Sequence, residues 1–364
     1  MTPTACRAVR RKATPDARSP RRVCTPVHGT NAPRRGTTAT TKSPRPSADR
    51  DAVAVWPGPV SPLAPPAPVG VAGCGTMGRL LVTALHASGY PVVAYDPDPQ
   101  ARTAAVEAGA TAVPTLDDLG SRVVAVVLSL PGPAEIVDVV GRLLARPGSV
   151  QVIIDTSTSD PATSRSLAAR ATAAHIGYLD APILGRPATA GRWTVPVGGE
   201  AAALERARPV LEAFAASIVH VGPTGAGHTV KLLNQMMFAV INAATAELMA
   251  AAPRVGIAPA LLYQAIVSSG AATVSGLFRE AGGKIARADF SPVFSIDLLC
   301  KDTDLAVRMA RAAGAAPVLT TMVQVLNHLA RAGGLGGLDS AALVQVYERL
   351  AQPPAEEPRD AASP

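Results

Sequence analysis

The order of apolar and polar positions predicts alternating strands and helices from about residue 68 onward. The stretches VGVAG, PVVAYD, VVAVVLSLP and VQVIIDT are short, apolar and rich in β-branched residues, which is typical of buried strands. Helical patterns lie between them, such as MGRLLVTALHASG, which we expect to end at Gly89. This alternation predicts an α/β fold, a doubly wound parallel sheet covered by helices.

The strand patterns end after VHVGPTGAG, and Ala- and Leu-rich helical patterns continue to about residue 350. The longest of them, at residues 225–252, is apolar on all sides, which predicts a buried helix. We therefore expect an α/β domain at residues 68–223 and an all-helical domain at residues 224–350. Residues 351–364 are expected to be a disordered end.

All of the excess positive charge belongs to an N-terminal tail at residues 1–67. Residues 1–50 contain 12 Lys and Arg against 2 Asp, whereas the remainder of the chain contains 22 basic and 25 acidic residues. The tail is rich in Arg, Pro, Ser and Thr, and it cannot bury enough apolar surface to offset its ordering entropy. Its composition also resembles a transit peptide or a nucleic-acid-binding arm. Because it has neither interleaved aromatic residues nor an amphipathic helix, we expect disorder and no nucleic-acid partner.

The chain shows no pattern for a membrane span, a metal site or a disulfide. Its most apolar stretch, KLLNQMMFAVINAATAELMAAAP, is interrupted by Lys, Asn, Gln and Glu. The six histidines form no ligand cluster, and four cysteines lack metal-ligand or disulfide spacing, namely Cys6, Cys24, Cys74 and Cys300. We therefore expect a cytoplasmic protein without a bound metal or a membrane partner.

Three glycines, Gly73, Gly75 and Gly78, form the spacing G-x-G-x-x-G, with Thr76 and Met77 before the third. In a Rossmann fold the first glycine permits a tight turn, the second lets a pyrophosphate approach the backbone, and the third lets the helix pack on the strand. The N–H groups and the positive dipole at the start of the helix then bind the phosphates. A tight turn without a ligand would also use glycines, but the strand before them and the helix after them favour a dinucleotide site.

An acidic residue, Asp96, ends the next predicted strand. A carboxylate at this position accepts hydrogen bonds from the ribose hydroxyls of NAD and repels the 2′-phosphate of NADP. Neither Pro97 nor Asp98 supplies a cation for that phosphate. We therefore predict that residues 68–223 bind NAD rather than NADP.

A lysine, Lys231, lies in the long apolar helical pattern and shares one helical face with Asn234 and Gln235. Within an apolar helix it must face a polar cleft or lose hydration at a large cost. A partly desolvated lysine has a lowered pKa and suits proton transfer in carbonyl chemistry. The alternative is a surface lysine whose stem covers apolar neighbours. A second lysine, Lys301, lies beside acidic residues, and by itself this pattern indicates only an exposed ion-pair face.

Taken together, these motifs resemble the β-hydroxyacid dehydrogenases related to 3-hydroxyisobutyrate dehydrogenase and tartronate semialdehyde reductase, in the 6-phosphogluconate dehydrogenase superfamily. The likeness runs from about residue 69 to 350. It rests on the order and spacing of VGVAGCGTMG, SLP, IIDTSTSDP, DAPILGRPATAGRWTVPVGG, GPTGAGHTVKLLNQ and FSIDLLCKD.

The resemblance implies a role for several residues. Lys231 matches the family's catalytic lysine, and Lys301 matches the lysine that contacts the nicotinamide end of the cofactor. Gln235 takes the place of a substrate-orienting amide. The loop positions that line the cofactor are matched by Leu130, Pro131 and Thr158.

The substrate loop departs from the family pattern. Relatives usually have D-x-P-V-S-G-G, whereas this chain has DAPILGR, with Leu184, Gly185 and Arg186 at the last three positions, and the loop is about two residues shorter before Gly191. Leu184 cannot donate the hydrogen bond of the missing serine. Arg186 either binds a substrate carboxylate through a bidentate interaction of its guanidinium or is an exposed loop residue.

The resulting hypothesis is an NAD-dependent oxidoreductase that interconverts a small β-hydroxy acid and its semialdehyde or keto acid. Lys231 is its acid and base, and Asn234 and Gln235 are candidates to orient the substrate oxygen. The relatives imply a homodimer or homotetramer. The alternatives are an imine reductase, in which another residue commonly replaces the lysine, and a non-catalytic NAD-binding module with a basic tail.

Overall fold

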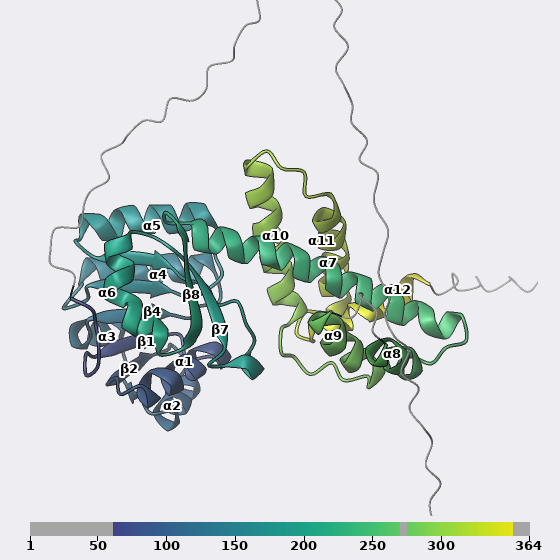
Figure 1. Cartoon of the computed structure of the whole chain (residues 1–364), viewed down its shortest axis with the longest axis horizontal. Coiled ribbons are helices and arrows are strands. Elements are labelled where there is room, and N and C mark those ends of the chain that lie inside the picture. The colour runs from purple at the N-terminus through teal and green to yellow at the C-terminus, as the bar shows by residue number, and fades with distance from the viewer. Residues whose placement is uncertain (1–60, 270–274, 352–364) are drawn as a thin grey trace, which may run out of the picture. The chain divides into compact units, whose positions relative to one another are not determined.

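The computed structural model describes residues 61–269 and 275–351, all of which belong to one compact unit (Figure 1). Nearly all of the predicted N-terminal tail and of the predicted disordered end lie outside the described residues, as do Cys6 and Cys24.

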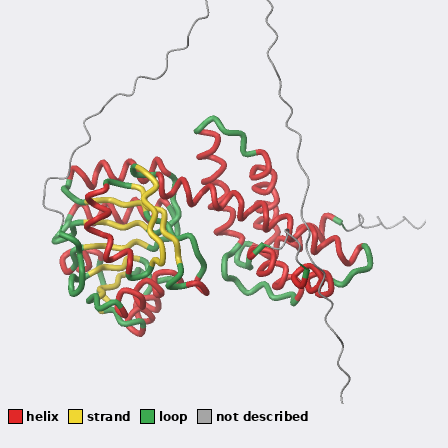
Figure 2. Tube along the Cα trace, viewed as in Figure 1, coloured by secondary structure: helices red, strands yellow, loops and turns green. Residues whose placement is uncertain are grey.

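The first part of the described chain forms an eight-stranded sheet, drawn in yellow in Figure 2. The strands follow the order β3-β2-β1-β4-β5-β6-β7-β8, in which β1 to β6 are parallel and β7 runs antiparallel to β6. The order of the first six is that of a doubly wound Rossmann sheet. The strands are β1 (Val69–Ala72), β2 (Val92–Tyr95), β3 (Thr111–Ala112), β4 (Ala125–Leu128), β5 (Val152–Asp155), β6 (Gly177–Asp180), β7 (Trp193–Gly198) and β8 (Ala215–Gly222).

Helices cover both faces of this sheet, which explains why its strands are apolar without alternation. In β4, Ala125 and Val127 belong to one core cluster, whereas Val126 and Leu128 belong to another. Because successive side chains of a strand point to opposite faces, the two clusters lie on opposite sides of the sheet. The covering helices are α1 (Thr76–Ala87), α2 (Pro99–Glu107), α3 (Leu116–Arg122), α4 (Pro133–Ala145), α5 (Pro161–Ala173) and α6 (Ala201–Glu212).

Within the described residues, no strand follows β8, and the rest of the chain is a helical domain, as predicted. The 29-residue helix α7 runs through it and packs against α9, α10, α11 and α12 (Figure 1). The helices are α7 (Ala226–Arg254), α8 (Pro259–Ser268), α9 (Gly276–Ala286), α10 (Ile296–Ala312), α11 (Val318–Ala330) and α12 (Val344–Leu350). Shorter helical segments are η1 (Pro187–Thr189), η2 (Arg331–Leu335) and η3 (Ser340–Leu343).

Two expectations need correction. Helix α7 is not buried on all sides, because Leu233 is 53% exposed and Met237 is 64% exposed. An apolar pattern shows that a helix face is hydrophobic, but it does not show whether another part of the protein covers that face. The packed structure also begins before residue 68, because Leu63 is buried in the core and accepts a hydrogen bond from the hydroxyl of Tyr90 through its carbonyl oxygen.

Helix α7 is also long and apolar enough to span a membrane by length and composition, and 44% of its apolar window is buried inside the protein. Core helices of water-soluble proteins pass the same test. The finding is therefore weak evidence for a membrane span.

Candidate functional site

The three glycines of the G-x-G-x-x-G motif form a turn, and each of them has a different steric role. Gly73 has φ +92°, and a Cβ added there would collide with the carbonyl oxygen of Ser129. A Cβ on Gly78 would collide with the carbonyl oxygen of Gly73, so this glycine lets α1 pack closely on the turn. A Cβ on Gly75 would meet no atom within 4 Å. The second glycine therefore borders open space, as a backbone that receives a phosphate must.

The start of α1 is suited to bind an anion. Gly75 occupies the N-cap position and has no side chain to accept a hydrogen bond from the N–H groups of the first helical turn, which begins with Thr76 and Met77. These N–H groups and the helix dipole favour a negatively charged group. The geometry of the motif fits the pyrophosphate of a dinucleotide.

Asp96 lies at the carboxyl end of β2, next to the glycine turn. Its Oδ2 accepts a hydrogen bond from the Cys74 N–H at 2.7 Å, and its Oδ1 accepts one from the Asp98 N–H at 2.9 Å. Burial, followed by the nearby Asp96 charge, raises the pKa of the Cys74 thiol to about 12. The carboxylate thus fixes the turn, and its remaining lone pairs can still accept hydrogen bonds from ribose hydroxyls.

An arginine at the same corner was missed by the sequence analysis. Nη1 of Arg102 donates to the carbonyl oxygen of Asp96 at 2.6 Å and to that of Pro97 at 3.1 Å. It lies six positions beyond Asp96, in α2, and so outside the two positions directly after Asp96 where a cation for a 2′-phosphate was sought. The first turn of α2 brings it back to the end of β2.

The loops that follow β4 and β5 are tied to each other and to the helical domain. The Leu130 N–H donates to Oγ of Ser157 at 3.0 Å, and Thr158 is the next residue of that loop. Nζ of Lys301, on α10, donates to the carbonyl oxygen of Pro131 at 2.8 Å. Lys301 is therefore not only part of an exposed ion-pair face. It reaches a loop that the resemblance predicts to line the cofactor.

Lys231 lies in the second turn of α7, and its ammonium group is directed to the substrate loop. Nζ donates to the carbonyl oxygen of Ile183 at 2.8 Å. Burial lowers the pKa of Lys231, the charge of Asp302 raises it in opposition, and the charge of Lys301 lowers it further. The ammonium group of Lys231 is thus held at a polar site, and Lys231 is not a surface lysine whose stem only covers apolar neighbours.

Gln235 and Asn234 differ in their surroundings, although both follow Lys231 within one turn. Gln235 is 5% exposed, and its Nε2 donates to Oδ2 of Asp302 at 2.5 Å. Asn234 is exposed, and its Nδ2 donates to Oε1 of Gln235 at 3.3 Å. The structure therefore holds Gln235, and not Asn234, in a fixed position beside the lysine.

Asp302 is a site residue to which the sequence analysis gave no role. It is 2% exposed, and its Oδ1 lies 3.0 Å from Nζ of Lys301. A buried carboxylate is stable only if it is paired or hydrogen-bonded, and Asp302 has both kinds of partner. Its position directly after Lys301 was visible in the sequence, but its contact with Gln235 crosses 67 residues.

The backbone of the substrate loop is hydrogen-bonded to β7 and within itself. Leu184 and Thr194 exchange two backbone hydrogen bonds, and the Arg186 N–H donates to Oγ1 of Thr189 at 3.1 Å. A Cβ on Gly185 would collide with the ring of Trp193. The N–H groups of Leu184 and Arg186 are therefore already used within the loop.

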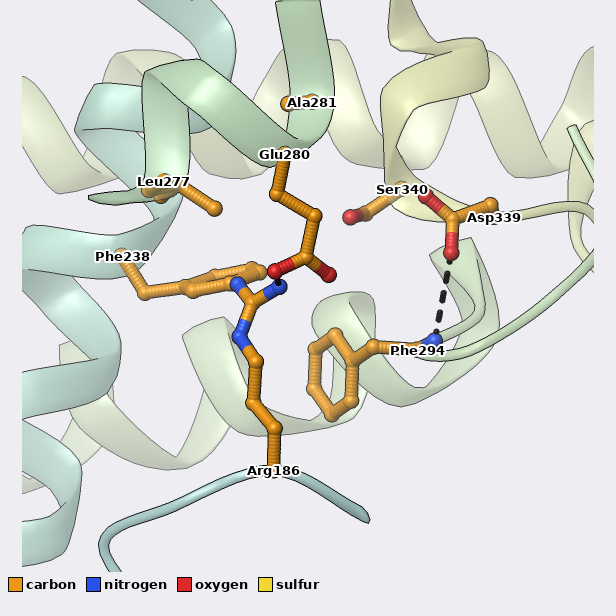
Figure 3. A pocket seen from close by; sticks show the side chains of 8 residues that line it. All are labelled: Arg186, Phe238, Leu277, Glu280, Ala281, Phe294, Asp339 and Ser340. Atoms are coloured by element: carbon orange, nitrogen blue, oxygen red, sulfur yellow. Dashed lines mark hydrogen bonds and ion pairs between the residues drawn. The ribbon is translucent and has the colours of Figure 1, made fainter. Parts of the chain in front are cut away.

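The Arg186 side chain extends from this loop into a small pocket of the helical domain (Figure 3). Its guanidinium forms an ion pair with Glu280 of α9 and lies 5.6 Å from the ring centre of Phe238 of α7. Burial lowers the pKa of Arg186, and the charge of Asp339 raises it. The side chain is 32% exposed. Arg186 is therefore neither a free loop residue nor a fully available cation.

Residues 61–269 and 275–351 contain no group of three or more His, Cys, Asp or Glu side chains that could hold a metal ion. The two cysteines in this part of the chain, Cys74 and Cys300, are buried and not joined in a disulfide.

Comparisons with known proteins divide the chain at the same place as the sheet and the helices. Residues 68–222 match a family model described as the NAD-binding domain of 6-phosphogluconate dehydrogenase. Residues 225–347 match one described as the NAD-binding region of NADP-dependent 3-hydroxyisobutyrate dehydrogenase.

Curated relatives and solved structures agree with these matches. The chain is 30% identical to 2-(hydroxymethyl)glutarate dehydrogenase of Eubacterium barkeri, over 78% of this chain and 95% of the relative. It is 31% identical to 3-hydroxyisobutyrate dehydrogenase of Pseudomonas aeruginosa, over 76% of this chain and 96% of the relative. The crystal structure of 3-hydroxyisobutyrate dehydrogenase from Salmonella typhimurium has a TM-score of 0.71 and 28% identity, covering 77% of this chain and 99% of that one.

Proposed function

Because this chain belongs to the β-hydroxyacid dehydrogenase family, we propose that it interconverts a small β-hydroxy acid and its semialdehyde or keto acid, with NAD as its cofactor. The single observation that carries the proposal is the placement of Lys231. Its Nζ contacts the substrate loop at Ile183, and Asp302 and Lys301 act on its pKa from the side of the cofactor loops.

Lys231 is the group that moves the proton. When bound, NAD accepts a hydride from the carbon that bears the substrate hydroxyl. In its neutral form Lys231 takes the hydroxyl proton during oxidation, and in its charged form it returns a proton during reduction. Burial lowers its pKa, which increases the fraction of the neutral base near neutral pH.

Gln235 is proposed to orient the substrate oxygen. Its Nε2 uses one hydrogen for Asp302, which leaves a second N–H for the substrate. Asn234, which is exposed and donates to Gln235, is proposed only to support that amide.

Arg186 is proposed to pair with the substrate carboxylate in place of the serine of relatives. The loop N–H groups of Leu184 and Arg186 are used within the loop, so the backbone there offers little to a carboxylate. A guanidinium has five N–H donors, and the ion pair with Glu280 leaves some of them free. The negative charge of Glu280 opposes this role.

The preference for NAD over NADP is proposed from Asp96. The carboxylate at the end of β2 favours free ribose hydroxyls and repels a 2′-phosphate. Arg102 lies at the same corner, but its Nη1 donates to the carbonyl oxygens of Asp96 and Pro97. Lys301, Leu130, Pro131 and Thr158 are proposed to line the nicotinamide end.

Self-association is proposed from an exposed apolar stripe on α11. Every member of the stripe is at least 49% exposed, and their spacing places them on one side of the helix. They are Val318, Leu319, Met322, Val325 and Leu329. A homodimer or homotetramer would cover this stripe, and light scattering of the purified protein would show a single-chain mass if the proposal is wrong.

The proposed function is tested by assaying the purified full chain with NAD and NADP against a panel of short hydroxy acids. The panel contains 3-hydroxyisobutyrate, 2-(hydroxymethyl)glutarate, L-threonate and L-serine, which the names of relatives suggest. We expect formation of NADH with at least one of them. Binding of NADH without turnover of any hydroxy acid would favour a non-catalytic module, and reduction of a cyclic imine alone would favour an imine reductase.

A further inference from the structure

A buried histidine joins the start of α7 to the loop that follows β5. The His228 side chain is 0% exposed, its Nε2 lies 3.1 Å from the carbonyl oxygen of Ser157, and its Nδ1 lies 2.7 Å from Oγ of Ser164. A carbonyl oxygen can only accept, so Nε2 carries a hydrogen. The other ring nitrogen, Nδ1, pairs with the hydroxyl of Ser164 on α5, which also lies 3.3 Å from the carbonyl oxygen of Asp160.

The backbone of His228 is fixed as firmly as its ring. Its N–H donates to Oδ2 of Asp180 at 2.8 Å, and the Gly225 N–H donates to Oδ1 at 2.7 Å. Asp180 is 0% exposed and ends β6, so it caps the first turn of α7 with both carboxylate oxygens. A Cβ on Gly227 would collide with the carbonyl oxygen of Asp180, which shows how closely the helix start fits against the strand end.

Ser157, which His228 holds, lies at the centre of the cofactor-lining loops. Its Oγ accepts the Leu130 N–H at 3.0 Å, and its own N–H donates to Oδ1 of Asp155 at 3.0 Å. Ser157 thereby joins the loop after β4 to the loop after β5, directly before Thr158. His228 and the two loops are therefore joined at this one residue, the histidine through its carbonyl oxygen and the loop after β4 through its hydroxyl.

Lys231 lies three residues after His228 on the same helix, about 4.5 Å along the helix axis at about 1.5 Å per residue. The hydrogen bond from His228 to Ser157 is therefore a short connection between the helix that carries the lysine and the loops that line the cofactor. The start of α7 lies beside α5 (Figure 1), so the second ring nitrogen braces the histidine from that side.

We propose that His228 is a positioning residue that fixes the loop at Ser157 and Thr158 against the helix that carries Lys231. It sets the distance between the nicotinamide end of the cofactor and the proton-accepting amine, and it touches neither substrate nor cofactor. This inference rests on the proposed function, since it adds a residue to the same site.

Substitution of His228 by glutamine or by asparagine tests its two hydrogen bonds separately. The amide nitrogen of glutamine lies as many bonds from Cα as Nε2 of histidine does, so His228→Gln can keep the donor to the Ser157 carbonyl. His228→Asn places its amide nitrogen where Nδ1 was and loses that donor. Ser164→Ala removes the partner of Nδ1, together with the hydroxyl's 3.3 Å contact to the carbonyl oxygen of Asp160, and leaves the hydrogen bond to Ser157 in place. It is the control for the other hydrogen bond.

The test measures kcat, the deuterium isotope effect on kcat with substrate labelled at the hydroxyl-bearing carbon, the Kd of NADH and the Tm. Misplacement of reacting groups costs on the order of ten- to a hundred-fold in rate, and we expect that loss in kcat for His228→Asn, with a larger isotope effect. We expect His228→Gln and Ser164→Ala to keep kcat within about threefold of wild type, because the hydrogen bond to Ser157 survives in both.

An equal loss of kcat in the Asn and Gln variants, with an unchanged isotope effect and a parallel loss of Tm, would overturn the proposal, because the histidine would then only support the fold. If the wild-type chain turned over no hydroxy acid, the proposed function would fail, but NADH binding would still test His228. In that case we expect His228→Asn, which loses the donor to Ser157, to weaken NADH binding by roughly tenfold, which corresponds to about 1.4 kcal/mol. We expect His228→Gln, which keeps that donor, to preserve NADH binding. Equal Kd values for both variants and wild type would overturn the inference.

Discussion

Gln235 donates an amide hydrogen to the buried carboxylate of Asp302, with Nε2 and Oδ2 2.5 Å apart. The second carboxylate oxygen of Asp302 lies 3.0 Å from Nζ of Lys301, whose own hydrogen bond reaches the carbonyl oxygen of Pro131. One carboxylate thus connects the amide proposed to orient the substrate with the lysine that holds the loop after β4. It also acts on the charge of Lys231.

The pH dependence of turnover should report on Asp302. Its negative charge raises the pKa of Lys231, against the larger effect of burial, so Asp302→Asn should lower that pKa. Oxidation needs neutral Lys231 and should begin to rise at a lower pH in the variant. Reduction needs charged Lys231 and should begin to fall at a lower pH. The pH profiles of kcat in both directions measure this.

The control for this experiment is Asp304→Asn, which removes a carboxylate two residues away that accepts hydrogen bonds from Gln324 and His328. Its profile should match that of the wild type. A profile for Asp302→Asn that stays in place or moves to higher pH would contradict the assigned electrostatic role.

Two variants of the glycine turn should separate cofactor binding from stability. Gly75→Ala adds a methyl group where no protein atom lies within 4 Å, so the Tm should stay near the wild-type value while NADH binding weakens. Gly78→Ala forces its methyl group against the carbonyl oxygen of Gly73, so unfolding free energy should fall by roughly 1–3 kcal/mol, as for other overpacked sites. Thermal unfolding and NADH titration separate the two. Tight NADH binding by Gly75→Ala would mean that phosphates do not lie over this glycine.

Cofactor choice should depend on Asp96. The wild-type chain should have a higher kcat/KM with NAD than with NADP, because the carboxylate repels the 2′-phosphate. Replacing Asp96 by Ala together with Pro97→Arg should move the preference toward NADP. Steady-state kinetics with both cofactors measure the ratio, and a wild-type enzyme that used NADP at least as efficiently as NAD would show the assignment to be wrong.

The role of Arg186 can be tested through its ion-pair partner. If the guanidinium holds the substrate carboxylate, Arg186→Ala should raise KM for an acidic substrate by roughly ten- to a hundred-fold, from a charge-assisted contact of about 1.5–3 kcal/mol. Glu280→Gln should lower the same KM, because it frees the guanidinium and removes a repelling charge. Neither change should affect an uncharged ester. Equal effects on acid and ester would mean that the pair only holds the loop to α9.

The sequence was sufficient for the features that depend on local pattern. Periodicity and spacing over short stretches of chain predict β1, β2, β4 and β5, the glycine turn and the helix that carries Lys231. They do not single out β3, β6 or β7. The contacts of Asp302 with Gln235 and of His228 with Ser157 join residues 67 and 71 positions apart, and no local pattern encodes them. The same limit applies to Arg186, whose partner on α9 depends on how the loop is directed, and to the exposed side of α7.

The central claim is that Lys231 transfers the proton, and the most direct measurement is turnover by Lys231→Ala and Lys231→Arg beside the wild type. Arginine can keep the positive charge near Ile183 but does not give up a proton in proteins, so it separates proton transfer from charge. We expect both variants to lose on the order of a hundred- to ten-thousand-fold in kcat, with an NADH Kd within about threefold of wild type. A folded Lys231→Ala or Lys231→Arg variant with near-normal kcat would contradict the account.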